Sequence, residues 1–585
     1  MKKATAVIFS LISVWALMLA YGISARNPLT VLAFAGIAFL VYKTFDQNDP
    51  KGIVFIHITS ALLAFFTFIV KIENACASYD SKAFKLMCIM IMASGLYILY
   101  FHLLKLIAAL IKPTDSIFYE KKTLPAKSVW GISFVVCFLA YIPWFLYSFP
   151  GIFSPDSIAQ FGQVIGVNPL SNHHPISNTF VMWVCYKIAG LFSKSVSERA
   201  GLYTFVQMTF LAFAISYMIY TLYKVLKLKA HYCFIILAVY AITPYNAVLS
   251  ILVGKDAMFG AIMMLFVSEV LRFVYTRDDE KKKVTKVFDA VRFILFGIGM
   301  CLFRTNGYYA FLLFSVCFIA IFIKDWKKVL IRIGVILLIT LLVKGPVMKS
   351  MNIIQPDIAE SLHVPEQQIS RIIANDRALS DDELRLLENV CDISYVKEFY
   401  VPSFADNIKE LVRAGHQEVI SENKLEYAKL YIKLGLKYPA DYLLAWKDLA
   451  EYIIFPEGDY DVAIIEGVYK NEIGVSQSSI IGGKALLKIR ELWVKVPNYI
   501  PVYGFIFSMG AFTWLFVISS MLILTNKKDR QRIAVLIPAI ALILSLLLAI
   551  PSAGEFRYAT SYILLAPFCL CVFKNISKPA EEEKK

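Results

Sequence analysis

Residues 129–175 read VWGISFVVCFLAYIPWFLYSFPGIFSPDSIAQFGQVIGVNPLSNHHP, and they join the two kinds of sequence from which the whole chain is built. The first part, Val129 to Tyr147, is apolar and close to the roughly 20 residues that a helix needs to cross a lipid bilayer. The second part, Ser148 to Pro175, is a polar loop that starts near the rigid pair Pro150-Gly151. The stretch therefore predicts a membrane-spanning helix that delivers a fixed polar loop to one membrane surface.

The composition extends this pattern to all 585 residues. Hydrophobic residues make up 58% of the chain and charged residues 18%, which excludes a soluble domain of ordinary composition. The apolar runs are continuous rather than alternating, and lipid accepts only helices or closed barrels, so the predicted fold is an all-α integral membrane protein. About fourteen transmembrane helices are predicted, near residues 5–22, 28–43, 52–70, 84–111, 128–148, 202–223, 231–251, 257–275, 289–303, 307–323, 329–343, 500–524, 532–550 and 557–573.

The net charge of +15 follows the pattern of a membrane protein rather than that of a nucleic-acid partner. Basic residues crowd the alternate loops 112–127, 277–288 and 525–531, so the positive-inside rule places these loops and the amino terminus in the cytoplasm. The first apolar run resembles a signal peptide, but another run follows at once, which favours an uncleaved first span. Segment 176–192 is ambiguous between a short span and a helix in the outer interface, and the alternation of basic loops favours the interfacial helix.

Four domains follow from this assignment of spans and loops. They are 1–127, four N-terminal transmembrane helices without an assigned role; 128–344, a transmembrane core with the outer loop 149–199; 345–498, an extracytoplasmic domain; and 499–585, C-terminal transmembrane helices and a cytoplasmic tail. The extracytoplasmic domain is predicted to be mostly helical, with Ser380 and Glu383 spaced as a capping box, and its helical period is lost after Pro456.

The polar loop holds the first candidate for chemistry. Asp156 is the only formally charged residue between Ser128 and Tyr186, and it lies one loop-length from the imidazoles of His173 and His174. The alternative is that Ser154 or Asp156 only caps a short helix over residues 157–164. Ten cysteines show neither metal-ligand spacing nor a disulfide framework.

The topology also gathers isolated polar groups on the same outer side. Ionisable groups at membrane edges are costly unless they are paired or used, so their clustering predicts a site. The groups are Asp156, His173 and His174; Lys255 and Asp256; Arg304 and Asn306; and Glu555, Arg557 and Tyr558. Three alternatives stay open: a solvated turn at Lys255-Asp256, snorkelling of Arg304 to the headgroups, and an ion pair between Arg557 and Glu555.

In these features the chain resembles the GT-C superfamily of polytopic glycosyltransferases, which includes protein O-mannosyltransferases and aminoarabinose transferases. Asp156, then His174-Pro175, then the helix 176–192 match the order of the superfamily's first outer loop. Where the superfamily has paired acidic residues, this chain has Asp156 followed by Ser157, which leaves the use of a divalent metal open. From Pro150 onward the chain looks most like an uncharacterised family of bacterial multi-pass, glycosyltransferase-like proteins. The residues that carry this likeness are Pro150-Gly151, Asp156-Ser157, Gln160, His174-Pro175, Lys255-Asp256, Gln367-Gln368-Ile369 and Asp406-x-Ile408-Lys409.

The resemblance implies an enzyme of the bacterial cell membrane. It would transfer a sugar from a polyprenyl-phosphate donor to a wall polymer, lipid or protein acceptor at the outer face, without nucleic acid and without a certain cofactor. Catalytic roles then fall to Asp156, as the base of an inverting displacement, and to His174. Arg557, Arg304 and Lys255 would bind the donor phosphate, with Asp256, Gln160, His173, Asn306, Glu555 and Tyr558 in support.

Two other classes of function remain. A transporter or flippase would carry charges deep in its spans, and Glu269 is the main such charge, toward an inner end. A non-catalytic envelope-assembly or sensor protein would use residues 345–498 to bind a partner and would not need Asp156.

Overall fold

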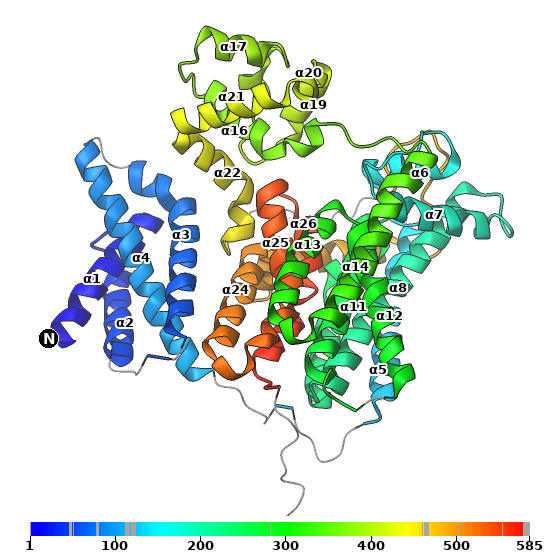
Figure 1. Ribbon diagram of the computed structural model, residues 1–585, viewed down its shortest axis with the longest axis horizontal. Helices are drawn as coiled ribbons and strands as arrows, with labels where there is room; N and C mark the ends of the chain where they lie inside the picture. Colours follow the sequence, from blue (N-terminus) through cyan, green and yellow to red (C-terminus); the bar gives the residue numbers. More distant parts are fainter. Residues whose placement is uncertain are drawn as a thin grey trace, which may run out of the picture.

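The computed structural model describes residues 2–45, 49–50, 52–77, 81–111, 117–118, 124–280, 282–458, 460, 462, 467–500, 502–552 and 554–576. Within these ranges the chain is helical, and its few paired extended residues form isolated bridges rather than a sheet. Most of the loop 112–127, Lys281 and the charged end 581–585 lie outside the described residues. The helices stand side by side in one broad layer, and a smaller group of helices lies on top of it (Figure 1).

Among the described residues, eight helices are long and apolar enough to cross a membrane on their own. They are α1 (Lys2–Tyr21), α2 (Pro28–Phe45), α3 (Ile53–Ala77), α4 (Lys82–Leu110), α5 (Ala126–Ser148), α8 (Val196–Val225), α11 (Lys255–Thr276) and the continuous run of η1 (Ile323–Asp325), α14 (Trp326–Leu342), η2 (Val343–Val347) and α15 (Met348–Ser350). The prediction of a helical, multi-pass membrane protein is therefore confirmed.

The count of fourteen spans stays a prediction, because the remaining segments are bent, short or more polar. Two are bent pairs, α9 (Ala230–Ile242) with α10 (Pro244–Ile251) at 61°, and η6 (Lys527–Val535) with α25 (Ile537–Ala549) at 60°. The others are α12 (Lys283–Leu302), α13 (Thr305–Ile321), α24 (Met509–Thr525), and α26 (Phe556–Ile563) with η7 (Ala566–Val572). Helix α7 (Ile176–Ala189), predicted to be interfacial, is not among the candidate spans.

One of the bends positions the site. Pro244 begins α10 directly after Thr243, because proline has no amide hydrogen to continue α9 and forces the residue before it out of the helical conformation. The redirected α10 ends at Ile251, and residues 252–254 then turn into the start of α11. Helix α11 is the most enclosed of the candidate spans, because nearly all of its residues are buried, so the core is assembled around it.

The four N-terminal helices form a separate bundle at one side of the core (Figure 1). Helix α3 joins this bundle to the rest of the molecule through contacts with α24 and α22 (Pro439–Ile454). Ion pairs at the upper end of α3 reinforce the junction, with Lys71 paired to Glu457 and Lys447 Nζ 3.3 Å from Glu73. The bundle is therefore docked both to the core and to the helices above it.

Residues 356–455 form the group of helices on top, here called the helical cap. It contains η3 (Ala359–Ser361), α16 (His363–Ala374), α17 (Asp381–Glu388), η4 (Ile393–Tyr395), α18 (Val396–Phe399), α19 (Asp406–Ala414), α20 (Glu418–Glu422), α21 (Lys424–Lys437) and α22. The predicted capping box is present, with Ser380 accepting from the Glu383 amide and Glu383 accepting from the Ser380 amide. The mostly helical character of this region is thus confirmed.

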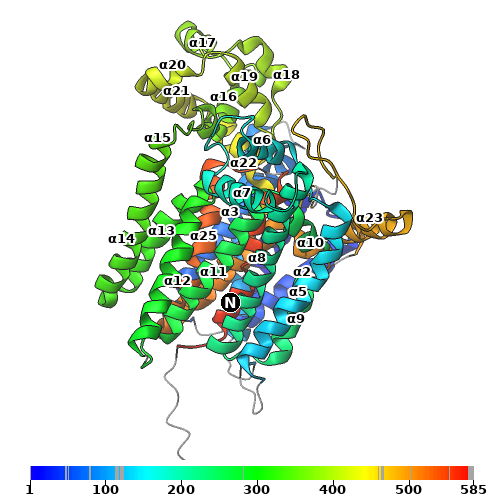
Figure 2. The same cartoon turned by 90° about the vertical axis from the view of Figure 1, so that its right-hand side faces the viewer.

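The sequence predicted that helical periodicity is lost after Pro456, and this prediction is wrong for residues 484–499. A helix, α23 (Lys484–Tyr499), forms beyond it and packs against α10 and η5 (Gly504–Phe507) of the core rather than against the cap. Figure 2 shows it at the edge of the molecule, apart from the cap. Residues 345–498 therefore comprise the cap and a second stretch that lies along the core.

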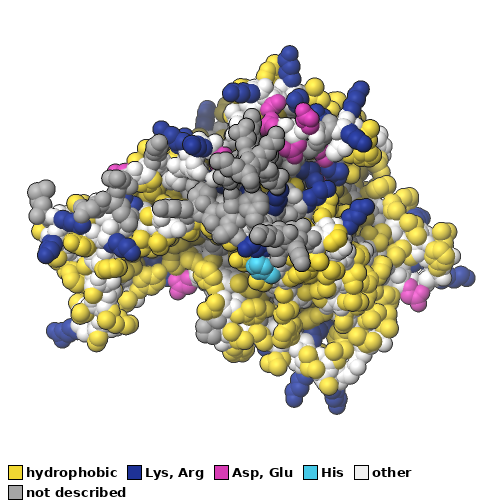
Figure 3. Space-filling model, turned by 90° about the horizontal axis from the view of Figure 1, so that it is seen from below, with side chains coloured by type: hydrophobic (Ala, Val, Ile, Leu, Met, Phe, Trp, Pro, Cys, Tyr) yellow, Lys and Arg dark blue, Asp and Glu magenta, His cyan; other side chains and the backbone are white. Residues whose placement is uncertain are grey.

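The loops rich in Lys and Arg at the far end of α11, α12 and η6 lie opposite the cap. Seen from that end, scattered basic side chains interrupt a surface that is otherwise largely hydrophobic (Figure 3). The arrangement agrees in direction with the predicted topology, and the assignment of this end to the cytoplasm stays a prediction.

Candidate functional site

The polar loop after α5 begins with a short segment that is held by backbone hydrogen bonds. Ile152 donates to the Ile251 carbonyl at 2.9 Å and accepts from the Val253 amide at 2.9 Å, so it pairs with the chain between α10 and α11. Gly151 has φ +141°, and a side chain there would lie 2.7 Å from Thr204 Oγ1, so the close approach requires glycine. The loop is thereby fixed against the start of α11.

Helix α6 (Pro155–Ile165) carries Asp156 in its first turn. The Ser154 hydroxyl accepts from the Ser157 amide at 3.4 Å, and Pro155 takes the first helical position, where its missing amide hydrogen costs nothing. The open question of capping is thus resolved, because Ser154 is the cap and the Asp156 carboxylate is directed elsewhere.

Asp156 faces the C-terminal helix α26. Arg557 Nη1 donates to Asp156 Oδ2 at 3.1 Å, and Arg557 Nε donates to Glu555 Oε2 at 2.8 Å. The guanidinium therefore bridges two carboxylates, one two residues away and one 401 residues away, so the ion pair with Glu555 that the sequence left open is present. Burial by itself would raise the pKa of Asp156, but the positive charges of Arg557 foremost and Lys255 outweigh it and hold the pKa below its usual value.

The two histidines of the loop have different surroundings. His174 is buried, and its Nδ1 lies 3.4 Å from Lys255 Nζ at the start of α11. Burial, followed by the Lys255 charge, lowers the pKa of His174 to about 3, so this imidazole is neutral at physiological pH. His173 is 44% exposed, and its Nδ1 lies 4.0 Å from Glu360 of the cap.

Asp256 and Arg304 form a buried pair beside these groups. Arg304 Nη1 lies 3.0 Å from Asp256 Oδ1, with the Arg304 side chain 5% exposed, and its guanidinium is stacked 4.8 Å from the centre of the Tyr558 ring. The alternatives of a solvated turn at Asp256 and of snorkelling by Arg304 are therefore wrong.

Gln160 supports the loop from behind. It donates to Thr179 Oγ1 at 2.9 Å and accepts from the Asn178 amide at 3.1 Å, which ties α6 to α7. Tyr203 of α8 continues the network by donating to Asn178 at 2.7 Å and to the Gly254 carbonyl at 3.2 Å. This chain of buried hydrogen bonds fixes Asp156 and Lys255 relative to each other.

The candidate residues meet around a polar cavity of about 340 Å³ between the core and the cap. Nine of the eleven residues selected from the sequence line it: Asp156, His173, His174, Lys255, Arg304, Asn306, Glu555, Arg557 and Tyr558. The other two, Gln160 and Asp256, line a smaller pocket of about 30 Å³ that shares Asp156, His174, Lys255 and Arg557 with the cavity. The predicted gathering of polar groups on one face is thus present.

The cap supplies cavity residues that the sequence analysis did not assign to the site. The polar and charged ones are Glu360, Ser361, His363, Asp406, Lys409, Glu410 and Arg413, and Pro356, Phe404 and Ala405 also line the cavity. Lys409 Nζ lies 2.5 Å from Asp406 and 3.5 Å from Glu360, while Arg413 binds Asp357, Glu360 and Glu410. From the sequence, Lys409 was noted only because the Asp406-x-Ile408-Lys409 motif carries the family likeness, and it was given no role in the site.

His363 connects the cap to the wall that carries Arg557. Its Nε2 lies 3.0 Å from the carbonyl oxygen of Pro551, which precedes α26. Burial lowers the pKa of His363 to about 4, so the imidazole is neutral and Nε2 is the donor to that carbonyl. The cap is therefore joined to the core by a hydrogen bond at the edge of the cavity.

An apolar groove of about 620 Å³ opens beside the polar cavity. Its lining includes Ile176, next to Pro175 of the polar cavity, and Met258, one helical turn after Lys255. It continues along α12 to Leu295 and along the α14–α15 run to Met351. A polar cavity and a hydrocarbon-like groove thus adjoin at the level of His174 and Lys255.

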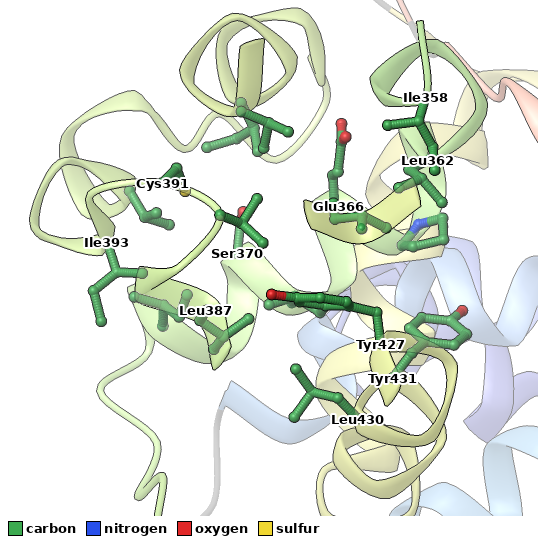
Figure 4. A pocket seen from close by; sticks show the side chains of 18 of the residues that line it. Ile358, Leu362, Glu366, Ser370, Leu387, Cys391, Ile393, Tyr427, Leu430 and Tyr431 are labelled. Atoms are coloured by element: carbon green, nitrogen blue, oxygen red, sulfur yellow. The ribbon is translucent and has the colours of Figure 1, made fainter. Parts of the chain in front are cut away.

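A second cavity, of about 320 Å³, lies inside the cap and is almost entirely apolar. Figure 4 shows Leu387, Ile393 and Leu430 around it, with Glu366 extending from its helix on the side of Ile358. Both carboxyl oxygens of Glu366 are buried without a hydrogen-bond partner, and burial raises the pKa of Glu366 to about 8. This carboxyl is therefore mainly protonated at neutral pH.

In the part of the chain that the structure describes, no group of three or more His, Cys, Asp or Glu side chains is arranged to hold a metal ion. The chemistry of the polar cavity is that of paired Arg, Lys and carboxylate groups with the neutral imidazoles of His174 and His363. Such a set binds anions through its cations and accepts protons through its carboxylates.

Comparison with known proteins identifies the family. The family model called DUF6020, a family of unknown function, matches residues 165–585, which includes every cavity residue except Asp156. No curated protein and no solved structure matches the chain. Because the match covers more than half of the sequence, the chain belongs to the DUF6020 family.

Proposed function

We propose that this protein is a membrane glycosyltransferase that moves a sugar from a polyprenyl-phosphate donor to an acceptor of the cell envelope. The observation that carries the proposal is the contact between Asp156 and Arg557 at the wall of a polar cavity that adjoins an apolar groove. A lipid-linked sugar phosphate needs these three elements together: a cation for phosphate, a carboxylate for the acceptor proton, and an apolar surface for the chain.

The cations and the groove support a lipid phosphate as donor. Arg557 offers a planar fork that binds phosphate oxygens in pairs, and Lys255 lies across the small pocket from it. Arg304, held by Asp256, adds positive charge to the same wall. The polyprenyl chain would lie in the groove that starts at Ile176 and Met258, directly below these cations.

In the proposed reaction the acceptor oxygen attacks the anomeric carbon while its proton passes to the Asp156 carboxylate. The bond between the anomeric carbon and the phosphate oxygen breaks, and the electron pair leaves with the phosphate, whose charge Arg557 and Lys255 stabilise. A single displacement of this kind inverts the anomeric centre. His174, neutral and buried, orients the loop and helps to hold Lys255 in place.

Arg557 also gives the reaction an order. In the free protein it binds Asp156 and makes that carboxylate a weak base. A donor phosphate would compete for the same guanidinium and so return basicity to Asp156 once the donor is bound. The donor would accordingly bind before the acceptor.

The wider setting belongs to the same proposal. The GT-C-like core, the fourteen spans, the bacterial cell membrane and the extracytoplasmic position of the cap and cavity are all part of it. The cap–core cavity would then open to the side where envelope polymers are assembled.

The rival reading as a transporter finds less support. Glu269, its main deep charge, accepts hydrogen bonds from Tyr217 and Arg292 and lies 3.6 Å from Arg272, at the end of α11 away from the polar cavity. A carboxylate held by three partners is poorly suited to bind and release a transported ion.

The test uses purified full-length protein with polyprenyl-phosphate sugars, and measures release of free polyprenyl phosphate. Asp156→Asn keeps the size of the side chain but removes the proton acceptor, so turnover should fall at least about a hundredfold, within the range of general base catalysis. Asp382→Asn, at an exposed carboxylate on α17, is the matched control and should keep the parent rate. Parent-level release by Asp156→Asn would remove the assignment and favour the transporter or assembly readings. In cells, deletion of the gene should remove a specific surface glycan, and Asp156→Asn should fail to restore it.

A further inference from the structure

A cavity of about 250 Å³ lies at the opposite end of α11 from the polar cavity. It is formed by the last turns of α11, the first turns of α12, and the η1–α14 segment. Because the 22 residues of α11 rise about 1.5 Å each, this cavity is roughly 30 Å from Lys255, at the other edge of the membrane-crossing region. It is thus separate from the candidate active site.

The acidic side chains of this cavity are all engaged. Glu269 and Asp289 both bind Arg292. Asp325 lies 3.6 Å from Lys328 and 3.9 Å from Arg277, and Asp278 lies 3.4 Å from Arg277. Each of these carboxylates thus already has at least one cationic partner within 4.0 Å.

Two basic side chains in the lining have no such partner among the described residues. Arg332 of α14 makes no ion pair or hydrogen bond there, and its guanidinium is held by the rings of Phe273 at 5.0 Å and Phe293 at 5.6 Å. Lys286 of α12 likewise has no partner. A preoriented guanidinium and a free ammonium at one cavity suit an anion with several oxygens.

The surface around the cavity points to a lipid. On α12, Val287, Phe288 and Val291 are exposed, and on α14 Trp326 and Ile331 are exposed. Tryptophan is enriched at the level of the headgroups, and exposed aliphatic side chains on a spanning helix contact acyl chains. The cations therefore lie where the phosphate of a bilayer lipid would reach them.

We propose that this cavity is a binding site for the phosphate of an anionic phospholipid, with Arg332 and Lys286 as its ligands and the adjacent faces of α12 and α14 in contact with the acyl chains. Basic pockets between transmembrane helices are a recurrent form of headgroup recognition. The proposal does not depend on the glycosyltransferase proposal, because none of its residues lines the polar cavity.

The test reconstitutes full-length protein in phosphatidylcholine nanodiscs with increasing fractions of phosphatidylglycerol. After transfer to neutral detergent, the phosphatidylglycerol that stays bound is counted by native mass spectrometry. We expect retention by the parent protein and at least a tenfold loss in the double variant Lys286→Gln/Arg332→Gln. Lys282→Gln/Lys324→Gln removes two exposed lysines that do not line the cavity and should retain lipid as the parent does.

The single variant Lys286→Gln, at an exposed position, keeps the test valid if the double variant does not fold, and it should lose at least threefold. Equal retention by the cavity variants and the control pair would overturn the proposal, as would equal retention of phosphatidylcholine. A third arm adds inorganic phosphate without anionic lipid. In this arm the melting temperature of the protein is compared with inorganic phosphate and with phosphatidylglycerol. An equal rise in melting temperature with phosphate alone would also overturn the assignment to a lipid.

Discussion

The carboxylates found near the two ends of α11, Asp156 of α6 and Glu269 of α11 itself, have contrasting surroundings. Near its start, Asp156 is 48% exposed, is bound by one arginine, and faces a cavity. Near its end, Glu269 is 1% exposed and is held by Tyr217, Arg272 and Arg292. A carboxylate with one partner and an open side can exchange that partner for a substrate, whereas one with three buried partners serves the fold. The number of partners and the exposed fraction, rather than residue type, separate candidate chemistry from structure.

The largest expected effect tests the buried ion cluster around Glu269. Glu269→Gln leaves Arg292 and Arg272 buried with less compensating charge, so the free energy of unfolding should fall by about 3–5 kcal/mol. Asp278→Asn, at an exposed carboxylate of the same end, is the control and should change it by less than about 0.5 kcal/mol. Unfolding in detergent would be followed by circular dichroism. Equal stability of the two variants would mean that the ion cluster is not structural and would reopen the transporter reading.

The second prediction adds a buried carboxyl without any partner, Glu366 of the cap. Burial raises the pKa of Glu366 from 4.5 to about 8 in the folded protein. The unfolded state therefore releases this proton at a lower pH than the folded state does. As a result, the free energy of unfolding is highest below about pH 4.5 and falls as the pH rises from 4.5 to about 8. Glu366→Gln should remove this dependence and, above about pH 8, be more stable than the parent by up to about 4 kcal/mol. Glu388→Gln, at an exposed position on α17, is the control. Melting temperatures measured across this pH range give the comparison, and parallel curves for parent and Glu366→Gln would contradict it.

The third prediction concerns Arg557, the partner of Asp156 at the polar cavity. Arg557→Ala should weaken use of the polyprenyl-phosphate donor by about ten- to over a hundredfold, because one charged hydrogen bond contributes roughly 1.5–3 kcal/mol. Arg557→Lys should recover only part of the loss, since a point charge replaces a fork. The measurement is the donor concentration dependence of polyprenyl phosphate release. Arg385→Ala, at an exposed arginine of the cap, should behave as the parent, and an unchanged donor dependence in Arg557→Ala would exclude Arg557 from the donor site.

The smallest expected effect lies far from both ends of α11. Ser380→Ala removes the side-chain acceptor of the capping box at α17 and should destabilise that helix by about 1 kcal/mol. Amide hydrogen exchange of residues 381–388 would detect it, with Ser421→Ala as an exposed control. Sugar transfer should be unaffected, and a loss of transfer would indicate that the cap contributes to the reaction through its stability.

The sequence was sufficient to predict the class of fold and the side chains from the core that meet in the cavity. Membrane-spanning runs are long and uniform, so the isolated polar groups between them stand out, and topology then places Asp156, Lys255 and Arg557 at one end. The cap residues were missed for the opposite reason. Lys409 and Arg413 lie on amphipathic helices in which charged residues are common, and only the packing of the cap on the core distinguishes them from ordinary surface charges.

Helix α23 was missed because it contacts α10 and η5 of the core instead of a neighbouring cap helix, and an irregular stretch rich in serine and glycine precedes it. The pairing of Asp156 with Arg557 was equally beyond the sequence, because 401 residues separate them and no local pattern records their contact. Long-range partners of this kind depend on how the spans pack.

That separation has a consequence for how the protein is made. Asp156 leaves the ribosome 401 residues before Arg557, and helices α7 to α25 are synthesised between them. Until α26 is inserted, the wall opposite Asp156 is absent and the polar cavity lacks Arg557. A chain cut short before Arg557, even one that has folded its N-terminal bundle, would therefore lack the Asp156–Arg557 contact and, under the proposed function, would be unable to use lipid-linked sugar.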